Sequence, residues 1–175
     1  GIFIENGRIT DNSPNGKLKS MIREIMDSFE IKLIVTANQD ILLKDILESD
    51  KEKLENILVK YNYGKRNGKN YSKLRLLSGA CVGLYTCPMA YTESEQFEPF
   101  LIDELERLGW GGLAESIGIT GCERQCFRPA TKSIGLVGSG RNFYQLKLLG
   151  TDDGRNQGKP LIDREENKIY LKLIP

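Results

Sequence analysis

The chain has 175 residues, of which 39% are hydrophobic and 28% are charged, and its formal net charge is +1. This balance is typical of a globular protein, and it argues against general nucleic-acid binding, for which a basic domain is expected. The chain contains no histidine, which excludes Ser-His and Cys-His nucleophiles, HExxH zinc sites and Cys2His2 fingers.

No apolar stretch is long enough to span a membrane. Glu5 and Arg8 interrupt the apolar start of the chain, which argues against a secretory signal. We therefore expect a cytoplasmic protein with neither a membrane nor a nucleic acid among its partners. Disulfides are rare in that compartment, so the four cysteines are candidates for metal ligands or catalytic groups.

The first part of the chain predicts a β-α-β-β-α segment. Hydrophobic periodicity and a capping box at Ser49–Glu52 place a strand at 2–5, a helix at 18–29, strands at 31–35 and 41–43, and a helix at 49–61. The helices are expected to bury apolar side chains, Leu18, Met21, Ile22, Ile25, Met26 and Phe29 in the first and Leu54, Ile57, Leu58 and Tyr61 in the second.

The polar, turn-rich stretch Arg66–Asn70 marks a boundary between domains at 1–68 and 69–175. In the second domain, a capping box at Thr92–Glu95 predicts a helix that ends at Gly109–Gly112. The expected buried side chains of that helix are Phe97, Phe100, Leu101, Leu105 and Leu108.

Short strands are predicted after that helix, at 117–119, 133–137 and 144–149. A loop over 151–159 then leads to a last strand at 168–174. Strands and helices alternate irregularly with short turns, which predicts an α+β fold in two lobes.

The cysteines come in two pairs, and the pairs are separated by the predicted helix. Five residues lie between Cys81 and Cys87, and three lie between Cys122 and Cys126. Glycines accompany both pairs, and they let the backbone bring its amides close to a buried inorganic group. Four thiolates from two loops suit the corners of a [4Fe–4S] cluster.

Three other interpretations of these cysteines stay open. Zinc also takes four thiolates, although its knuckles space ligands by roughly two to four residues and the first pair fits that poorly. Two structural disulfides are a second alternative. Four inert buried thiols are the third, because free cysteine is common in protein cores.

Four stretches of the sequence resemble the assimilatory sulfite and nitrite reductases. Residues 79–95, GACVGLYTCPMAYTESE, are similar to their first cluster motif, and TGCERQCFRPA at 120–130 with IGLVG at 134–138 looks like the second. Residues 3–9 and 34–39 resemble the opening and middle of the second ferredoxin-like half-domain. The resemblance is collinear and spans nearly the whole chain.

The resemblance implies a ferredoxin-like half-domain over 1–68, followed by a 4Fe-4S α+β domain with a mixed sheet over 69–175. It also implies that Cys81, Cys87, Cys122 and Cys126 hold a [4Fe–4S] cluster, with Cys126 as the bridge to a sirohaem iron. By the same resemblance, Arg124 and Gln125 lie beside the sirohaem. The family usually has Pro-Asn-Gly between the last two cysteines, where this chain has Glu123, Arg124 and Gln125.

Sulfite reduction to sulfide by six electrons is the activity that the resemblance implies for the complete enzyme. The basic residues that bind sulfite come from the first half of such enzymes, so this stretch is expected to be inactive without that N-terminal half. A flavoprotein subunit or a ferredoxin would supply electrons. The alternatives are part of an ammonia-forming nitrite reductase, a non-catalytic iron-sulfur electron-transfer module and a zinc-stabilised interaction domain. The segment 36–39 is expected to form a structural turn.

Overall fold

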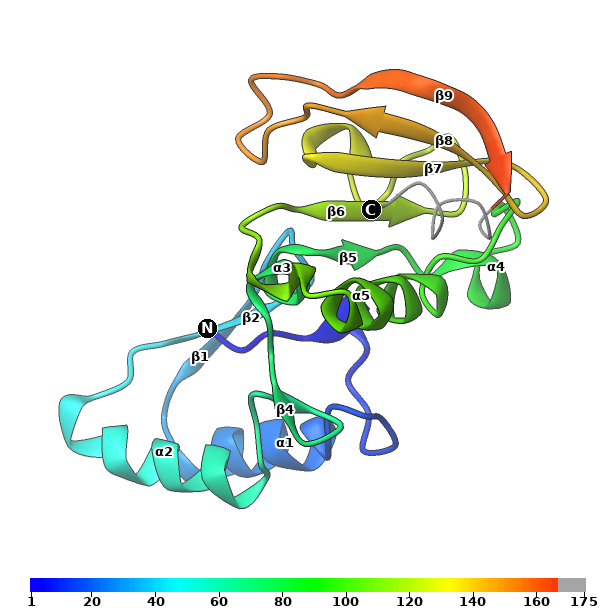
Figure 1. Ribbon diagram of the computed structural model, residues 1–175. Coiled ribbons are helices and arrows are strands. Elements are labelled where there is room, and N and C mark those ends of the chain that lie inside the picture. The colour runs from blue at the N-terminus through cyan, green and yellow to red at the C-terminus, as the bar shows by residue number, and fades with distance from the viewer. Residues whose placement is uncertain (167–175) are drawn as a thin grey trace. The chain divides into compact units, whose positions relative to one another are not determined.

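The computed structural model describes residues 1–166, and the chain divides into two compact units, Gly1–Tyr71 and Ser72–Pro175 (Figure 1). The predicted strand at 168–174 lies outside the described residues. None of the helices in residues 1–166 is both long and apolar enough to cross a membrane.

The first unit contains two helices, two small antiparallel hairpins and two 3-10 turns. In chain order they are η1 (Glu5–Gly7), α1 (Leu18–Ser28), β1 (Lys32–Val35), β2 (Ile41–Lys44), η2 (Glu48–Asp50), α2 (Lys51–Lys60), β3 (Lys65–Arg66) and β4 (Lys69–Asn70). The predicted strand at 2–5 is wrong, because Ile2 makes one isolated bridge to Ile41 and the chain turns into η1.

Both predicted helices of this unit form, and their apolar faces meet in one core. That core contains Ile2, Ile4, Leu18, Met21, Ile25, Ile41 and Ile57. Met26 was predicted to be buried, but it lies at the edge of the face and is 37% exposed. The capping box at Ser49–Glu52 is also wrong, because Asp50 is the N-cap of α2 and no side chain caps it.

The second unit is built on a five-stranded mixed sheet. Its elements are α3 (Lys73–Leu77), β5 (Gly79–Ala80), α4 (Gly83–Thr86), α5 (Phe97–Arg107), η3 (Trp110–Gly112), β6 (Ile117–Thr120), η4 (Pro129–Thr131), β7 (Ile134–Gly140), β8 (Phe143–Leu148) and β9 (Lys159–Glu166). The sheet order is β5-β6-β7-β8-β9. Strands β5, β6 and β7 pair in parallel, and the pairs β7–β8 and β8–β9 are antiparallel. This confirms the predicted α+β class with a mixed sheet.

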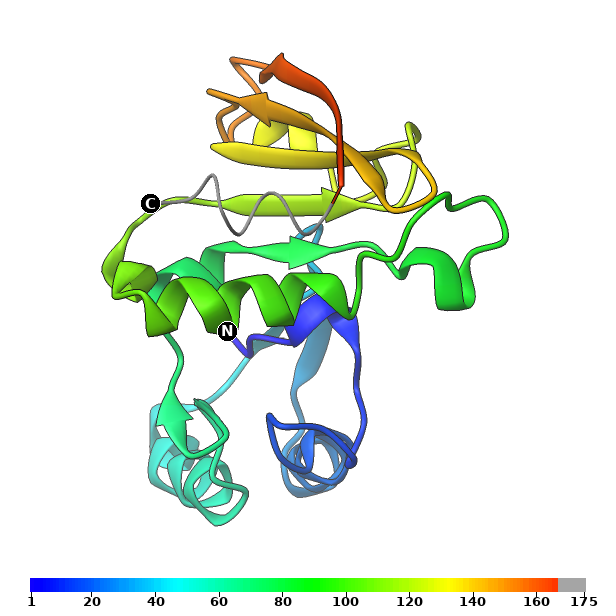
Figure 2. The same ribbon diagram turned by 45° about the vertical axis from the view of Figure 1, so that its right-hand side comes forward.

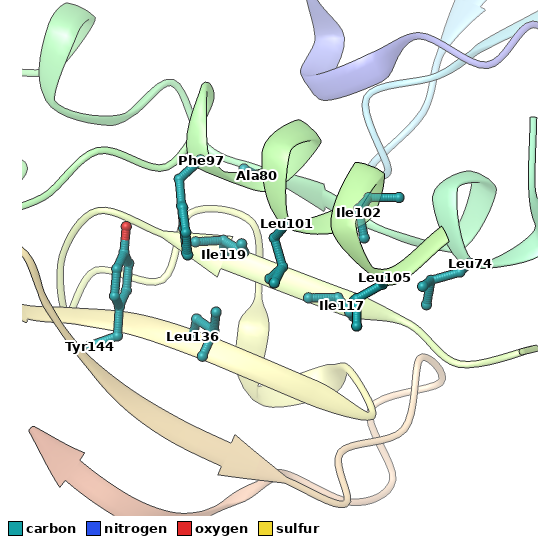
Figure 3. Packing of buried hydrophobic residues seen from close by; sticks show 10 residues of the cluster. All are labelled: Leu74, Ala80, Phe97, Leu101, Ile102, Leu105, Ile117, Ile119, Leu136 and Tyr144. Atoms are coloured by element: carbon teal, nitrogen blue, oxygen red, sulfur yellow. The ribbon is translucent and has the colours of Figure 1, made fainter. Parts of the chain in front are cut away.

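Helix α5 covers the sheet beside β5 and β6 (Figure 2). Figure 3 shows Leu101 and Leu105 of this helix turned toward Ile117 and Ile119 of β6. Burial of an aliphatic side chain of this size contributes about 1.5–3 kcal/mol, so the helix is held chiefly by this face.

Two expectations about α5 are wrong. Phe100 and Leu108 were predicted to be buried, but they are 51% and 45% exposed, because the buried face of the helix carries Glu98 and Ile102 in their place. The capping box at Thr92–Glu95 does not form either. The helix begins at Phe97, and its N-cap, Gln96, has no side-chain cap.

Candidate metal centre

The two cysteine pairs leave the sheet at the same end. Strands β5 and β6 are parallel neighbours with Ala80 opposite Ile119, so Cys81 and Cys122 follow the carboxyl ends of adjacent strands. The short helix α4, which lies between Cys81 and Cys87, is found beyond the arrowheads of both strands in both views (Figures 1 and 2). Parallel pairing of two strands that are each followed by a cysteine loop therefore brings the two loops together.

Cys81 is held by contacts to the second loop. Its amide donates to the carbonyl of Ile119 at 3.0 Å, which extends the β5–β6 pairing by one step. The amide of Gly121, which directly precedes Cys122, donates to Cys81 Sγ at 3.3 Å. A backbone donor aimed at a cysteine sulfur is the kind of contact that stabilises a thiolate.

Glycines permit the two loops to approach this closely. A Cβ at Gly121 would lie 2.6 Å from the carbonyl oxygen of Thr92, and one at Gly138 would lie 2.3 Å from the carbonyl oxygen of Gly121. Gly83 has φ +61°, and a Cβ there would meet the amide of Ser94 at 2.6 Å. No larger residue fits at these three positions without moving the backbone.

The segment Tyr91–Gln96 fastens both loops to the sheet, and we call it the bracket. The amides of Tyr91 and Thr92 donate to the carbonyl of Gly121 at 2.8 and 3.2 Å. The carboxylate of Glu93 accepts from the amide of Tyr85, which lies in α4, at 3.2 Å. The hydroxyl of Tyr144 in β8 donates to the carbonyl of Glu93, and its ring stacks on Phe97 with centroids 5.4 Å apart (Figure 3).

The four thiols differ in exposure. Cys122 is buried, Cys81 and Cys87 are half-buried, and Cys126 is exposed. Cys126 is followed by Phe127, which is 3% exposed and packs on Gly79. The exposed fourth thiol therefore belongs to a residue whose next neighbour along the chain is anchored in the core.

The chemistry of this region fits a thiolate-bound cluster, although the sulfurs are not gathered into a metal site. Within residues 1–166 no three cysteine, aspartate or glutamate side chains are grouped so that they could hold a metal ion. However, Thr92 Oγ1 is buried and lacks a hydrogen-bond partner among the described residues. An unsatisfied hydroxyl beside both loops fits a place where a further group supplies the missing acceptor. The assignment of the four cysteines as ligands stays a prediction.

Arg124 and Gln125 lie on the turn between Cys122 and Cys126. Arg124 is exposed. Gln125 is half-buried, and its amide donates to the carbonyl of Cys122 at 3.3 Å. Its φ is +53°, a left-handed conformation that favours glycine. The departure from the family pattern at Gln125 therefore falls on a position where the backbone suits the usual glycine.

The predicted turn at 36–39 is present in the first unit. The hydroxyl of Thr36 accepts from the amide of Asp40 at 3.1 Å, and Gln39 has φ +70°. This hydrogen bond closes the hairpin between β1 and β2.

Curated proteins align with nearly the whole chain. It is 36% identical over 177 aligned residues to the sulfite reductase [NADPH] hemoprotein beta-component of Leptospira biflexa, covering 98% of this chain and 32% of that protein. The corresponding protein of Staphylococcus carnosus is 38% identical over 99% of this chain and 29% of its own length. The chain belongs to the sulfite reductase family.

The sulfite reductase [ferredoxin] of Synechococcus elongatus is 34% identical over 100% of this chain and 28% of its own length. The chain thus spans about a third of the length of these relatives. Among solved structures, the Mycobacterium tuberculosis NirA protein matches with a TM-score of 0.67 at 21% identity, over 89% of this chain and 31% of that chain, which supports the fold. No family model matches the sequence.

The sequence pointed to this family through the motifs around the cysteines, but it did not show which side chains hold the cysteine loops. Ser94 and Thr92 lie within the first motif, where their spacing suggested a helix cap. Phe127 lies within the second motif and Tyr144 outside both motifs, and nothing in the sequence indicates that either side chain contacts the elements around the first pair of cysteines. The glycines around the cysteines were the signal that the backbone is crowded here.

Proposed function

We propose that this stretch supplies the four ligands of a [4Fe–4S] cluster in a sulfite-reducing enzyme, and that Cys126 bridges the cluster to sirohaem. The observation that carries the proposal is the hydrogen bond from the amide of Gly121 to Cys81 Sγ, which joins the two cysteine loops at adjacent strand ends. When bound, the coupled centre would supply the electrons for the six-electron reduction of sulfite to sulfide.

The residues of the chain would divide this work among themselves. Cys81, Cys87 and Cys122 would bind the cluster and no other group, and the hydrogen bonds of the bracket would hold their backbone in place. Cys126 is the exposed thiol, as suits a ligand shared with a group that also contacts another part of the enzyme. Arg124, exposed on the same turn, would offer its charge to a sirohaem carboxylate or to the anionic substrate.

The activity of the complete enzyme requires residues outside this stretch. The relatives are about three times as long as the region they share with this chain. We infer that the partner region is the N-terminal half of the same kind of enzyme. The relatives are named for NADPH or for ferredoxin, and we propose that a flavoprotein subunit or a ferredoxin supplies the electrons here. Those names also favour sulfite over nitrite as the substrate.

Metal analysis separates this proposal from its main competitor. The protein would be purified without oxygen, and iron and zinc would be measured together with the visible absorption of a cubane cluster. Iron with acid-labile sulfide is the expected result. Zinc in place of iron would reject the cluster and favour a zinc-stabilised domain.

Activity tests the second half of the proposal. The isolated stretch is expected to produce no sulfide from sulfite, because the sulfite-binding residues lie elsewhere. Production of sulfide by this stretch without the remainder of the enzyme would overturn the division of labour. A complete enzyme with Arg124→Ala is expected to bind sirohaem or sulfite more weakly, and unchanged sirohaem content and kinetics would remove that role.

A further inference from the structure

Ser94 lies against Cys81 in a way that the cluster ligands themselves do not explain. Its side chain is fully buried, at 0% exposure. Its Oγ lies 3.1 Å from Cys81 Sγ and 2.9 Å from the carbonyl oxygen of Cys81. One hydroxyl therefore has two possible acceptors on the same residue.

Whether the sulfur of Cys81 is a free thiol or a metal-bound thiolate decides which of the two acceptors the hydroxyl uses. In the free thiol, Ser94 donates to the carbonyl while the S–H group donates back to Ser94 Oγ, so both groups are satisfied. A metal-bound cysteine has no S–H and carries negative charge. The serine proton then has a charged acceptor within reach, and hydrogen bonds to ionised acceptors are roughly twice as strong as neutral ones.

We propose that Ser94 is a positioning residue that donates its hydroxyl proton to Cys81 Sγ in the cluster-bound protein and thereby raises the reduction potential of the cluster. This inference rests on the proposed cluster. A hydrogen bond to a ligand sulfur stabilises the reduced cluster, which carries more negative charge, more than the oxidised one. The amide of Gly121 donates to the same sulfur, so Cys81 would be the ligand with two donors.

The surroundings of Ser94 hold its hydroxyl in place. Gly83 faces it so closely that a Cβ there would lie 2.8 Å from Ser94 Oγ. The neighbouring residue, Glu93, is tied through its carboxylate to the amides of Tyr85 and Gln96 at 3.2 and 3.0 Å. Because the side chain is fully buried, its hydroxyl is shielded from water and has the carbonyl oxygen and the sulfur of Cys81 within hydrogen-bond distance.

The test is a redox titration of the cluster in the complete protein, followed by electron paramagnetic resonance, for wild type and Ser94→Ala. Loss of one hydrogen bond to the sulfur is expected to lower the midpoint potential, so that the ratio of reduced to oxidised cluster at a fixed potential falls about fivefold. Resonance Raman spectra are expected to show a shifted Fe–S(Cys) stretch in the same variant.

Ser116→Ala is the matched control. Ser116 is also buried, at 2% exposure, and its hydroxyl accepts from the amide of Ser133 at 3.1 Å and lies 3.4 Å from the hydroxyl of Ser133, at the opposite end of β6. This variant loses a buried hydroxyl without touching a cysteine, so its potential and Fe–S stretch are expected to match wild type.

The outcomes separate the two proposals. If wild type carries no iron and no acid-labile sulfide, the proposed cluster fails and this inference fails with it. If wild type and Ser94→Ala both carry the cluster at the same potential and with the same Fe–S stretch, the hydroxyl stays on the carbonyl and this inference alone is overturned. If Ser94→Ala does not fold, the Fe–S stretch of wild type in H2O and in D2O decides, and the absence of any isotope shift would contradict a donor on the sulfur.

Discussion

The ring of Phe127 lies over Gly79, where a Cβ would come within 2.5 Å of the ring atom Cζ. Phe127 directly follows the fourth cysteine of the chain, and Gly79 lies two residues before the first. The contact therefore fixes the end of the second cysteine loop against the strand that starts the first. Lys132 covers the same ring with its ammonium group 5.4 Å from the centroid.

Phe127→Ala is expected to cost about 3–5 kcal/mol of the free energy of unfolding, because it leaves a large cavity in the core. Urea denaturation measures this loss, and iron per folded chain measures the effect on Cys126. Phe100→Ala is the matched control, since that ring is 51% exposed and its removal is expected to cost less than about 1 kcal/mol. Equal losses for the two variants would contradict the anchoring role of Phe127.

Gln125→Gly is expected to stabilise the protein. Gln125 has φ +53°, and relief of the strain of a non-glycine residue there, set against the entropy that glycine loses on folding, leaves about 0.5–1 kcal/mol. The midpoint of chemical denaturation is the measurement. A lower midpoint would mean that contacts of the glutamine side chain outweigh the backbone strain.

Arg75 forms the largest buried ionic group in the second unit. It is 1% exposed and donates to Asp103 at 2.5 Å and to Glu106 at 2.9 and 3.1 Å. Arg75→Met is expected to lose about 2–3 kcal/mol of stability, because it leaves these carboxylates partly buried without their cation.

Arg107→Met provides the comparison for Arg75. Arg107 pairs with Glu104 at 2.8 Å, but its side chain is 65% exposed. Exposed pairs contribute at most about 1 kcal/mol, so this variant is expected to unfold nearly as wild type does. A loss for Arg107→Met as large as that for Arg75→Met would contradict the role given to burial.

The stability of the second unit is expected to depend on pH through Glu106. Burial raises the pKa of this carboxyl, but hydrogen bonds from Arg75 and Ser72 and the charge of Arg75 outweigh burial and hold the pKa below its ordinary value of 4.5. A carboxyl with a lowered pKa stabilises the fold above pH 4.5, and that contribution is lost as the pH falls through the folded-state pKa.

Glu106→Gln tests the sign of this effect. The stability difference between wild type and Glu106→Gln, measured by urea unfolding, is expected to be largest at neutral pH and to shrink as the solution is acidified below pH 4.5. A difference that grows on acidification would show that the carboxyl is held above its ordinary pKa.

The sequence predicted those parts of the fold that depend on local periodicity. Helices α1, α2 and α5 and strands β6, β7 and β8 lie within a few residues of their predicted positions, because the helices repeat apolar residues along one face and the strands are short runs rich in apolar residues. It missed β5, whose two residues, Gly79 and Ala80, form a strand only because β6 lies beside them. Tertiary pairing decides such a short strand.

The sequence predicts four cysteine ligands for the candidate site, an assignment that stays a prediction, and it did not predict the side chains that support their loops. Cysteines are recognised in the sequence as possible metal ligands, and their spacing and the neighbouring glycines indicate a cluster. The role of Ser94 depends on the loop from 82 to 93 folding back so that the serine reaches Cys81. The residues Thr92–Glu95 also match the capping-box pattern, so the sequence predicted a helix cap where the structure has the bracket.

The central claim is that Cys81, Cys87, Cys122 and Cys126 together hold one cubane cluster. Iron and acid-labile sulfide would be quantified in anaerobically purified protein, for wild type and for each Cys→Ser variant. The expected result is about four iron and four sulfide per chain in wild type and loss of most of both in every variant. A wild-type protein without sulfide, or variants at Cys81 and Cys122 that keep the full iron content, would contradict the claim.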